Sequence, residues 1–193
     1  MKILEKIRGI DIYLLDQIIK GNLNKDSRIL DAGCGHGRNI ISLIKEGYSI
    51  DAIDPDIEKV KEIEHVFMNK KSTIEISDIE GFSTKKTYDF IICNAVLHFA
   101  QNHEQFKRMI DSLTKLSANN GTLFIRMTSN FATNKSFKID QNGLAYLPDD
   151  TTRYLLTEDN LNYILKNFTY KEPLKTVNVS NLRCMTTLVL TKI

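Results

Sequence analysis

Three alternating glycines, Gly33, Gly35 and Gly37, are the residues of this chain whose spacing is best suited to ligand chemistry. They stand between an apolar run that ends at Asp31 and a stretch with helical spacing, which predicts a strand-to-helix turn. Glycine has no Cβ and adopts positive φ freely, so the backbone can pass close to an adenosine-type ligand. The dinucleotide fingerprint G-x-G-x-x-G is not met, because Arg38 stands where its last glycine is required. The turn therefore predicts a cofactor site of another kind.

Carboxylates stand at the ends of the two apolar runs that border this turn. Asp31 closes the first run, and Asp54 closes the second just before Pro55. Together with the glycines they resemble motif I of the class I S-adenosylmethionine-dependent methyltransferases. The resemblance implies that Gly33 and Gly35 pass under the methionine part of the cofactor, that Asp54 binds the ribose hydroxyls, and that Asp31 supports the loop and the cofactor's ammonium group. The alternative is an ordinary strand-to-helix turn in which Asp54 caps the helix that Pro55 starts.

The resemblance extends to two later strand ends. It implies that Asp78 binds the adenine amino group and that Ile79 stacks on the adenine ring. The run 89–99 is similar to the fourth motif of the family, so Asn94 and His98 are expected near the methyl-transfer site. Asn94 is a candidate cofactor contact, with a bond to its own backbone as the alternative. His98 is the candidate general base, with packing beside its aromatic neighbour as the alternative.

Four further side chains are candidates for the acceptor side of the site. Arg126 lies near the carboxyl end of a predicted strand, where open α/β sheets place their ligand crevice, and an arginine there can bind an acidic substrate. We count it with His98 as a catalytic candidate. Arg183 is a second cation that the C-terminal strands return toward the crevice, and Tyr13 and Tyr154 are candidate lid residues. The alternatives are ion-pair arginines with packed stems and tyrosines that belong to the core.

The elements around these residues alternate in the order of an α/β fold. A helix at 10–19 precedes five strands with helices between them, and a further helix opens at 157. The strands are expected at 27–31, 49–54, 73–76, 88–93 and 122–127. Two last β segments, 168–179 and 183–190, are too close for a crossover helix and must pair antiparallel. We therefore predict a Rossmann-like, doubly wound, mostly parallel seven-stranded sheet with a C-terminal antiparallel β hairpin. A dinucleotide-binding fold would instead place a sixth parallel strand there.

Length predicts one methyltransferase domain over 1–193, with residues 1–24 as an N-terminal helical cap. The stretch 128–156 is long for a connector and is expected to be an insertion on the substrate side. Three cysteines without a C-x-x-C pair predict no metal site and a reducing, cytoplasmic location. The N-terminal residues are too often charged for a signal peptide or a membrane span. A formal net charge of +2 lacks the basic excess expected of a protein that binds a nucleic-acid backbone, so we expect a small-molecule partner and no nucleic acid.

These residues together predict S-adenosylmethionine as the cofactor and direct methyl transfer to a small-molecule acceptor, of a general or tellurite-resistance-like type. At 94–97 the chain reads Asn-Ala-Val-Leu, not the N-P-P-aromatic motif of enzymes that methylate DNA adenine or glutamine. Two alternatives stay open: an RNA methyltransferase, and a module that binds the cofactor without catalysis. A dinucleotide-dependent oxidoreductase is the weakest.

Overall fold

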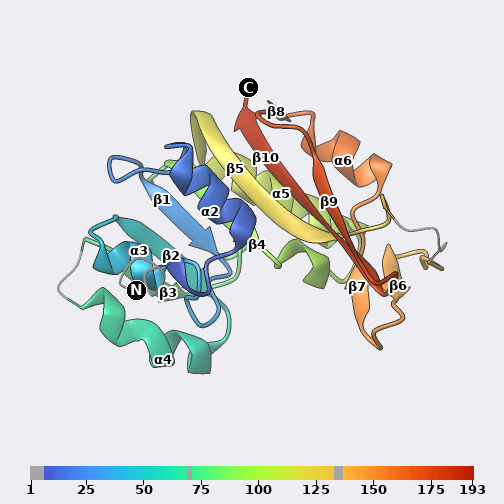
Figure 1. Ribbon diagram of the computed structural model, residues 1–193, viewed down its shortest axis with the longest axis horizontal. Helices are drawn as coiled ribbons and strands as arrows, with labels where there is room; N and C mark the ends of the chain where they lie inside the picture. Colours follow the sequence, from blue (N-terminus) through green and yellow to red (C-terminus); the bar gives the residue numbers. More distant parts are fainter. Residues whose placement is uncertain (1–6, 69–70, 133–136) are drawn as a thin grey trace.

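The structure of the chain is a computed structural model that describes residues 7–68, 71–132 and 137–193 (Figure 1). Its main sheet has eight strands: β1 (Ile29–Ala32), β2 (Ile50–Asp54), β3 (Thr73–Ile76), β4 (Tyr88–Asn94), β5 (Ser117–Ser129), β8 (Phe168–Tyr170), β9 (Lys175–Val179) and β10 (Arg183–Lys192). Their spatial order is β3-β2-β1-β4-β5-β10-β8, with β9 also beside β10. The first five pair in parallel, and β10 runs antiparallel to β5. The predicted Rossmann-like sheet and its C-terminal antiparallel hairpin are confirmed.

Helices cover both faces of this sheet. They are α2 (Ile12–Ile19), α3 (Ile41–Lys45), α4 (Ile57–Phe67), α5 (His103–Leu116), α6 (Glu158–Ile164) and the short 3-10 helix η1 (Leu97–Phe99). Side chains of α2, α3 and α4 share one core with Phe90, Ile92 and Phe124, whereas α5 and α6 share the other with Ile91 and Cys93. Because neighbouring residues of a strand point to opposite faces, the apolar strand β4 contributes to both cores. None of the helices in the described ranges is long and apolar enough to span a membrane.

The last part of the sheet has one strand more than the seven predicted. The expected edge strand at 168–179 is divided into β8 and β9, which both pair with β10. Pro173 lies in the interruption and has no N–H to donate to a ladder. The N–H groups of Lys171 and Glu172 both point to the carbonyl oxygen of Val189, at 2.9 and 3.4 Å, so two residues oppose one. A bulge therefore separates two halves of one predicted strand.

The stretch expected to be an insertion, 128–156, contains a small hairpin that its sequence did not predict. Strands β6 (Leu144–Tyr146) and β7 (Thr152–Tyr154) pair antiparallel in a second sheet. Residues 133–136 of this stretch, like residues 1–6 of the expected N-terminal cap, lie outside the described residues. The hairpin turn is closed by a bond from the Leu147 N–H to the Thr151 carbonyl (2.8 Å).

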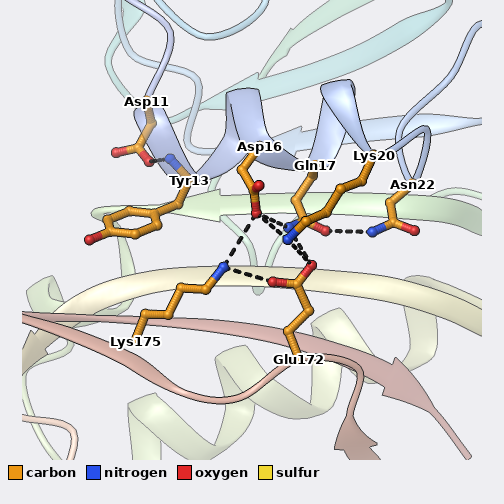
Figure 2. A network of polar contacts seen from close by, with 8 residues as sticks. All are labelled: Asp11, Tyr13, Asp16, Gln17, Lys20, Asn22, Glu172 and Lys175. Carbon is orange, nitrogen blue, oxygen red and sulfur yellow. Dashed lines mark hydrogen bonds and ion pairs between the residues drawn. The ribbon is translucent and has the colours of Figure 1, made fainter.

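Helix α2 is tied to the bulge between β8 and β9 by charged side chains (Figure 2). Glu172 accepts hydrogen bonds from Gln17, Lys20 and Lys175 at 2.9, 2.9 and 2.7 Å. The two lysines also reach Asp16, at 2.6 Å from Lys20 and 3.3 Å from Lys175. A helix near the start of the chain is thereby fastened to its last strands. We call these five residues the α2 latch.

Candidate functional site

A cavity of about 580 Å³ opens at the carboxyl ends of β1, β2 and β4. This is the point where the strand order reverses around β1, the usual ligand crevice of a doubly wound sheet. Six of the seven residues predicted to contact a cofactor line it: Gly33, Gly35, Asp54, Asp78, Ile79 and Asn94. The seventh, Asp31, is buried at the end of β1 with 1% of its surface exposed. The geometry therefore brings the predicted cofactor residues to one place.

The glycine loop is held against the end of β2. Gly33 has φ +93°, and a Cβ there would lie 2.3 Å from Cγ2 of Val96, so a larger residue clashes with the loop after β4. Gly35 has φ +55°, and apart from Gly35 and its two chain neighbours no atom of the described residues lies within 4 Å of the position its Cβ would take. The first glycine is thus required by packing. At Gly35 the missing side chain leaves open space in the cavity.

Asp54 shapes this loop as well as lining the cavity. Its Oδ2 accepts the N–H of Gly35 at 2.8 Å, and its Oδ1 accepts the N–H of Asp56 at 3.0 Å. The alternative role of Asp54 as a helix cap is wrong, because Asp56 caps α4 by accepting from the N–H groups of Glu58 and Lys59. A buried carboxylate that still faces the cavity is suited to accept from ligand hydroxyl groups.

Buried polar atoms beneath the cavity lack partners inside the protein. In the described part of the chain, neither amide atom of Asn94 nor Oδ2 of Asp31 has a hydrogen-bond partner. Burial raises the pKa of Asp31 to about 7, the negative charge of Asp54 adds to the rise, and Arg38 opposes it. Unpaired buried groups of this kind are costly, so a ligand that bonds to them gains affinity.

Asp78 and Ile79 form the wall beyond β3. Ile79 is buried, with 3% exposed, and packs in the core under α5. Asp78 is exposed, and its Oδ1 accepts the N–H of Gly81 at 2.6 Å. An apolar side chain beside a carboxylate provides a surface for an aromatic ring and an acceptor for its amino group.

Several lining residues were missed by sequence reasoning. Gln105 and Met109 reach the cavity from α5, and Phe99 reaches it from η1. Gln105 lies in the first turn of α5, where the Asn102 side chain accepts its N–H at 2.8 Å. These residues have no motif of their own. Their place depends on how α5 packs on the sheet.

His98 lies next to the cavity but is not among the residues that line it. It is 7% exposed, and its Nδ1 is 3.2 Å from Oγ1 of Thr128 at the end of β5. Burial, together with the charges of Arg153 and Arg183, lowers the pKa of His98 to about 4. The imidazole is therefore neutral at pH 7, which leaves one ring nitrogen able to accept a proton.

Arg126 and Tyr13 lie together on the α2 side of the sheet and outside the cavity lining. The Nη1 of Arg126 is 3.1 Å from Oδ2 of Asp11, the residue that caps α2. Its guanidinium also lies over the Tyr13 ring, 5.5 Å from the centroid. The arginine predicted from the strand end is thus partly engaged by the N-terminal helix.

Two predicted acceptor-side residues lie elsewhere. Tyr154 is completely buried, stacks on Phe106 and donates its hydroxyl to Asn160 at 2.9 Å, so it is a core residue and not a lid. Arg183 pairs with Asp149 at 3.1 Å and does not line the cavity. Both positions follow the alternatives stated above. No three His, Cys, Asp or Glu side chains in the described ranges gather into a possible metal site.

A protein-family model described as a methyltransferase domain matches residues 8–171. Among curated proteins, the ubiquinone biosynthesis O-methyltransferase of Rickettsia prowazekii (strain Madrid E) is 33% identical over 109 residues, which are 54% of this chain and 43% of that protein. The same enzyme of Rickettsia bellii (strain OSU 85-389) is 32% identical over 111 residues, covering 54% and 45%. The chain thus spans less than half the length of these relatives.

Solved structures share the fold at low sequence identity. The N-methyltransferase NodS from Bradyrhizobium japonicum WM9 in complex with S-adenosyl-L-homocysteine matches with a TM-score of 0.69 and 17% identity, over 93% of this chain and 84% of that one. The magnesium protoporphyrin IX methyltransferase ChlM from Synechocystis PCC 6803 with bound SAM matches with a TM-score of 0.68 and 19% identity, over 97% and 79%. TehB from Haemophilus influenzae matches with a TM-score of 0.66 and 19% identity, over 96% and 63%.

Proposed function

The chain belongs to the class I S-adenosylmethionine-dependent methyltransferases, and from this membership we propose that it transfers the methyl group of S-adenosylmethionine to a small-molecule acceptor. The observation that carries the proposal is the cavity beside the glycine loop: Asn94 lines it, Asp31 is buried near the end of β1, and both have atoms without a partner among the described residues. The names of the curated relatives, O-methyltransferases of ubiquinone biosynthesis, support a small molecule as acceptor.

The residues of the cavity fit this cofactor. Backbone at Gly33 and Gly35 gives close approach, and the open space at Gly35 leaves room for a ligand. We assign Asp54 to the ribose hydroxyls and Asp31 to the cationic ammonium group, because each carboxylate faces or underlies the cavity. Asn94 would take a polar group of the same ligand.

The adenine end of the cofactor is assigned to Asp78 and Ile79, because both line the same cavity.

The ammonium group of the cofactor near Asp31 favours the ionised form of this carboxyl group. It therefore opposes the effect of burial on the pKa of Asp31.

When bound, S-adenosylmethionine supplies a methyl carbon on a positively charged sulfur, which an acceptor lone pair displaces. The protein mainly holds the acceptor in line, and such alignment is worth about 7–11 kcal/mol in favourable systems. We place His98 as the base for an acceptor that must lose a proton, since its imidazole is neutral at pH 7. Arg126 is proposed to bind the acceptor.

The setting of the reaction is part of the proposal. A formal net charge of +2 favours a small acceptor over RNA. The three cysteines, all within the described ranges, are free thiols, in keeping with a reducing cytoplasm. We propose one catalytic domain over 1–193, with 128–156 on the acceptor side.

The decisive experiment compares binding of S-adenosylmethionine, S-adenosylhomocysteine and NAD by calorimetry. We expect both S-adenosyl compounds to bind, and Asp54→Asn to weaken them at least tenfold, because a hydrogen bond to a charged group is worth about 1.5–3 kcal/mol. Asp56→Asn is the matched control, since asparagine is also a good N-cap. Preference for NAD would overturn the proposal.

A labelled-methyl assay over small-molecule and RNA pools then tests catalysis. Product from the small-molecule pool supports the proposal. Product from RNA alone favours the RNA methyltransferase, and tight binding without any product favours a non-catalytic module.

A further inference from the structure

Four polar side chains form a row across the sheet beneath α2. Asn94 on β4 pairs in register with Arg126 on β5, which pairs with Thr187 on β10, which in turn pairs with Lys175 on β9. Side chains at paired positions of adjacent strands share one face of a sheet. We call these four residues the polar row.

The face is the one that α2 covers. Ile92, Phe124 and Val189 each lie two positions along the strand from a member of the polar row, and therefore on the same face of the sheet. All three belong to the core that includes Leu14 of α2. Lys175 reaches up from this face to Asp16 of α2, and Figure 2 shows the ring of Tyr13 nearby. The polar row thus crosses the sheet just beyond an apolar core, at the carboxyl ends of β4 and β5.

The polar row has more hydrogen-bonding capacity than the described residues use. Within those ranges, both amide atoms of Asn94, Nε of Arg126 and Oγ1 of Thr187 are buried without a partner. Asn94 is 8% exposed and Thr187 is 1% exposed, so neither is a surface side chain. Leaving such groups unpaired costs about 1–3 kcal/mol each, and several on three adjacent strands indicate a ligand site.

The unused atoms are mostly donors. Arg126 Nε, the Asn94 amide nitrogen and the Thr187 hydroxyl each have a proton to donate, and only the Asn94 oxygen is purely an acceptor. Arg126 keeps its Nη1 contact with Asp11 at 3.1 Å while Nε stays free to donate. Lys175, at the far end of the row, is already paired with Asp16 and Glu172 in the α2 latch, so Arg126 supplies the charge for a ligand. Several donors beside a guanidinium favour an anionic oxygen ligand.

The polar row is continuous with the cofactor cavity, because Asn94 belongs to both. From this geometry we propose that the polar row is the acceptor subsite and that it binds a carboxylate group of the methyl acceptor. The proposal rests on the proposed function and names its substrate class. A carboxylate bound by Arg126 and Thr187 lies beside Asn94, the residue that faces the methyl donor.

Entry to the subsite depends on α2. The Arg126 side chain is 20% exposed, but its Nε and the Thr187 hydroxyl are covered. The cover includes Tyr13, whose ring lies 5.5 Å from the Arg126 guanidinium and 5.9 Å from Nζ of Lys175. A carboxylate therefore displaces the Tyr13 ring or α2 when it binds.

The test titrates benzoate, and separately benzamide, into the full chain saturated with S-adenosylhomocysteine. Affinity is measured by calorimetry, and the Arg126 Nε–H signal is followed by NMR. We expect benzoate to shift that signal and to bind at least tenfold more tightly than benzamide, because only the carboxylate carries a charge opposite to that of Arg126. Arg126→Gln and, separately, Thr187→Val should each weaken benzoate binding, the first by about tenfold or more.

The matched control is Arg28→Gln, which removes an arginine paired with Asp89 just before β1, at the opposite end of the sheet. It should leave benzoate binding unchanged. Equal affinity for benzoate and benzamide, no shift at Arg126, or equal losses in R126Q and R28Q would overturn the subsite. Binding of S-adenosylhomocysteine, measured first in every variant, reports on the proposed function separately and on the fold of each variant.

Discussion

Asp31 is the residue whose ionisation links the stability of the ligand-free protein most directly to ligand binding. Its carboxyl is fully buried, one of its oxygens is unpaired among the described residues, and Asp54 lies close enough to disfavour its charge. These effects raise its pKa to about 7 from an ordinary value of 3.8. Near neutral pH the folded protein thus holds a proton that the unfolded chain releases.

This gives stability a definite pH dependence. Because the folded state binds the extra proton, the unfolding free energy falls as pH rises from about 4 to about 7 and levels off above. Asp31→Asn removes this pH-dependent loss of unfolding free energy and should therefore stabilise the cofactor-free protein at pH 8. The gain is at most about 4 kcal/mol, because each unit of pKa difference corresponds to about 1.36 kcal/mol. Urea denaturation of both proteins at pH 4 and pH 8 measures the difference. A gain at pH 8 no larger than at pH 4 would contradict this account.

His98 provides the residue-scale test of catalysis. Its pKa of about 4 keeps it neutral from pH 6 to 8, so its ionisation should not shape the rate over that range. If it accepts the acceptor's proton, His98→Ala should lower kcat by roughly 100-fold, the usual contribution of a positioned base.

The comparison variant is His65→Ala, on the exposed surface of α4. An unchanged rate for His98→Ala at saturating acceptor would end the base hypothesis. A bell-shaped rate profile with a limb near pH 6.5 would place another group in that role.

At the scale of elements, α2 connects the two halves of the candidate site. Its cap residue Asp11 accepts from Arg126 and donates its own N–H to Asn39, which lines the cofactor cavity. Its other end is held by the α2 latch, where three hydrogen bonds from Gln17, Lys20 and Lys175 lower the pKa of Glu172 to about 2 against the effect of burial. Both ends of the helix are therefore fixed by polar contacts, in addition to the packing of Leu14 in the core, and such polar contacts break and re-form more readily than a large apolar contact.

Glu172→Gln should loosen α2 without unfolding the domain. The variant keeps the side-chain shape but loses the charge that both lysines contact, so we expect amides of Ile12–Ile19 to exchange with solvent about tenfold faster at pH 7. Hydrogen exchange followed by mass spectrometry measures this. Glu80→Gln, which breaks a pair with Arg108 on α5, is the control. Faster exchange over the whole chain would mean global destabilisation and would contradict a local latch.

Elements with a strong internal pattern were predictable from sequence, and those that depend on contacts were not. The strand β4 was predictable because a continuous apolar run is a local sign of a strand that is buried on both faces. Strands β6 and β7 have three residues each, too few to show the alternation of apolar and polar residues that predicts a strand. Most of the residues proposed to bind the cofactor could be brought to one cavity from sequence because they lie at or just after strand ends. Gln105 was missed because packing of α5 brings it to the cavity, and the core position of Tyr154 likewise depends on contact with Phe106.

At the scale of the whole molecule, the cofactor cavity joins segments from residue 33 to residue 109, so a ligand that fills it binds only the folded chain. The cores on both sides of the sheet contribute walls: Ile79 and Met109 from one, Cys34 from the other. Binding therefore stabilises the domain as a unit and not one loop.

S-adenosylhomocysteine at a hundredfold excess over its dissociation constant should add about 2.7 kcal/mol to the unfolding free energy. For a domain of this size, the melting temperature should then rise by roughly 5–10 °C in differential scanning calorimetry, at about 2–4 °C per kcal/mol. NAD at the same concentration should leave the melting temperature unchanged, because Arg38 replaces the third dinucleotide glycine. Asp54→Asn should show a smaller shift at the same ligand concentration, since its affinity is lower. An equal rise with NAD, or an equal rise in Asp54→Asn, would mean that the ligand stabilises the fold from somewhere other than the cavity beside the glycine loop.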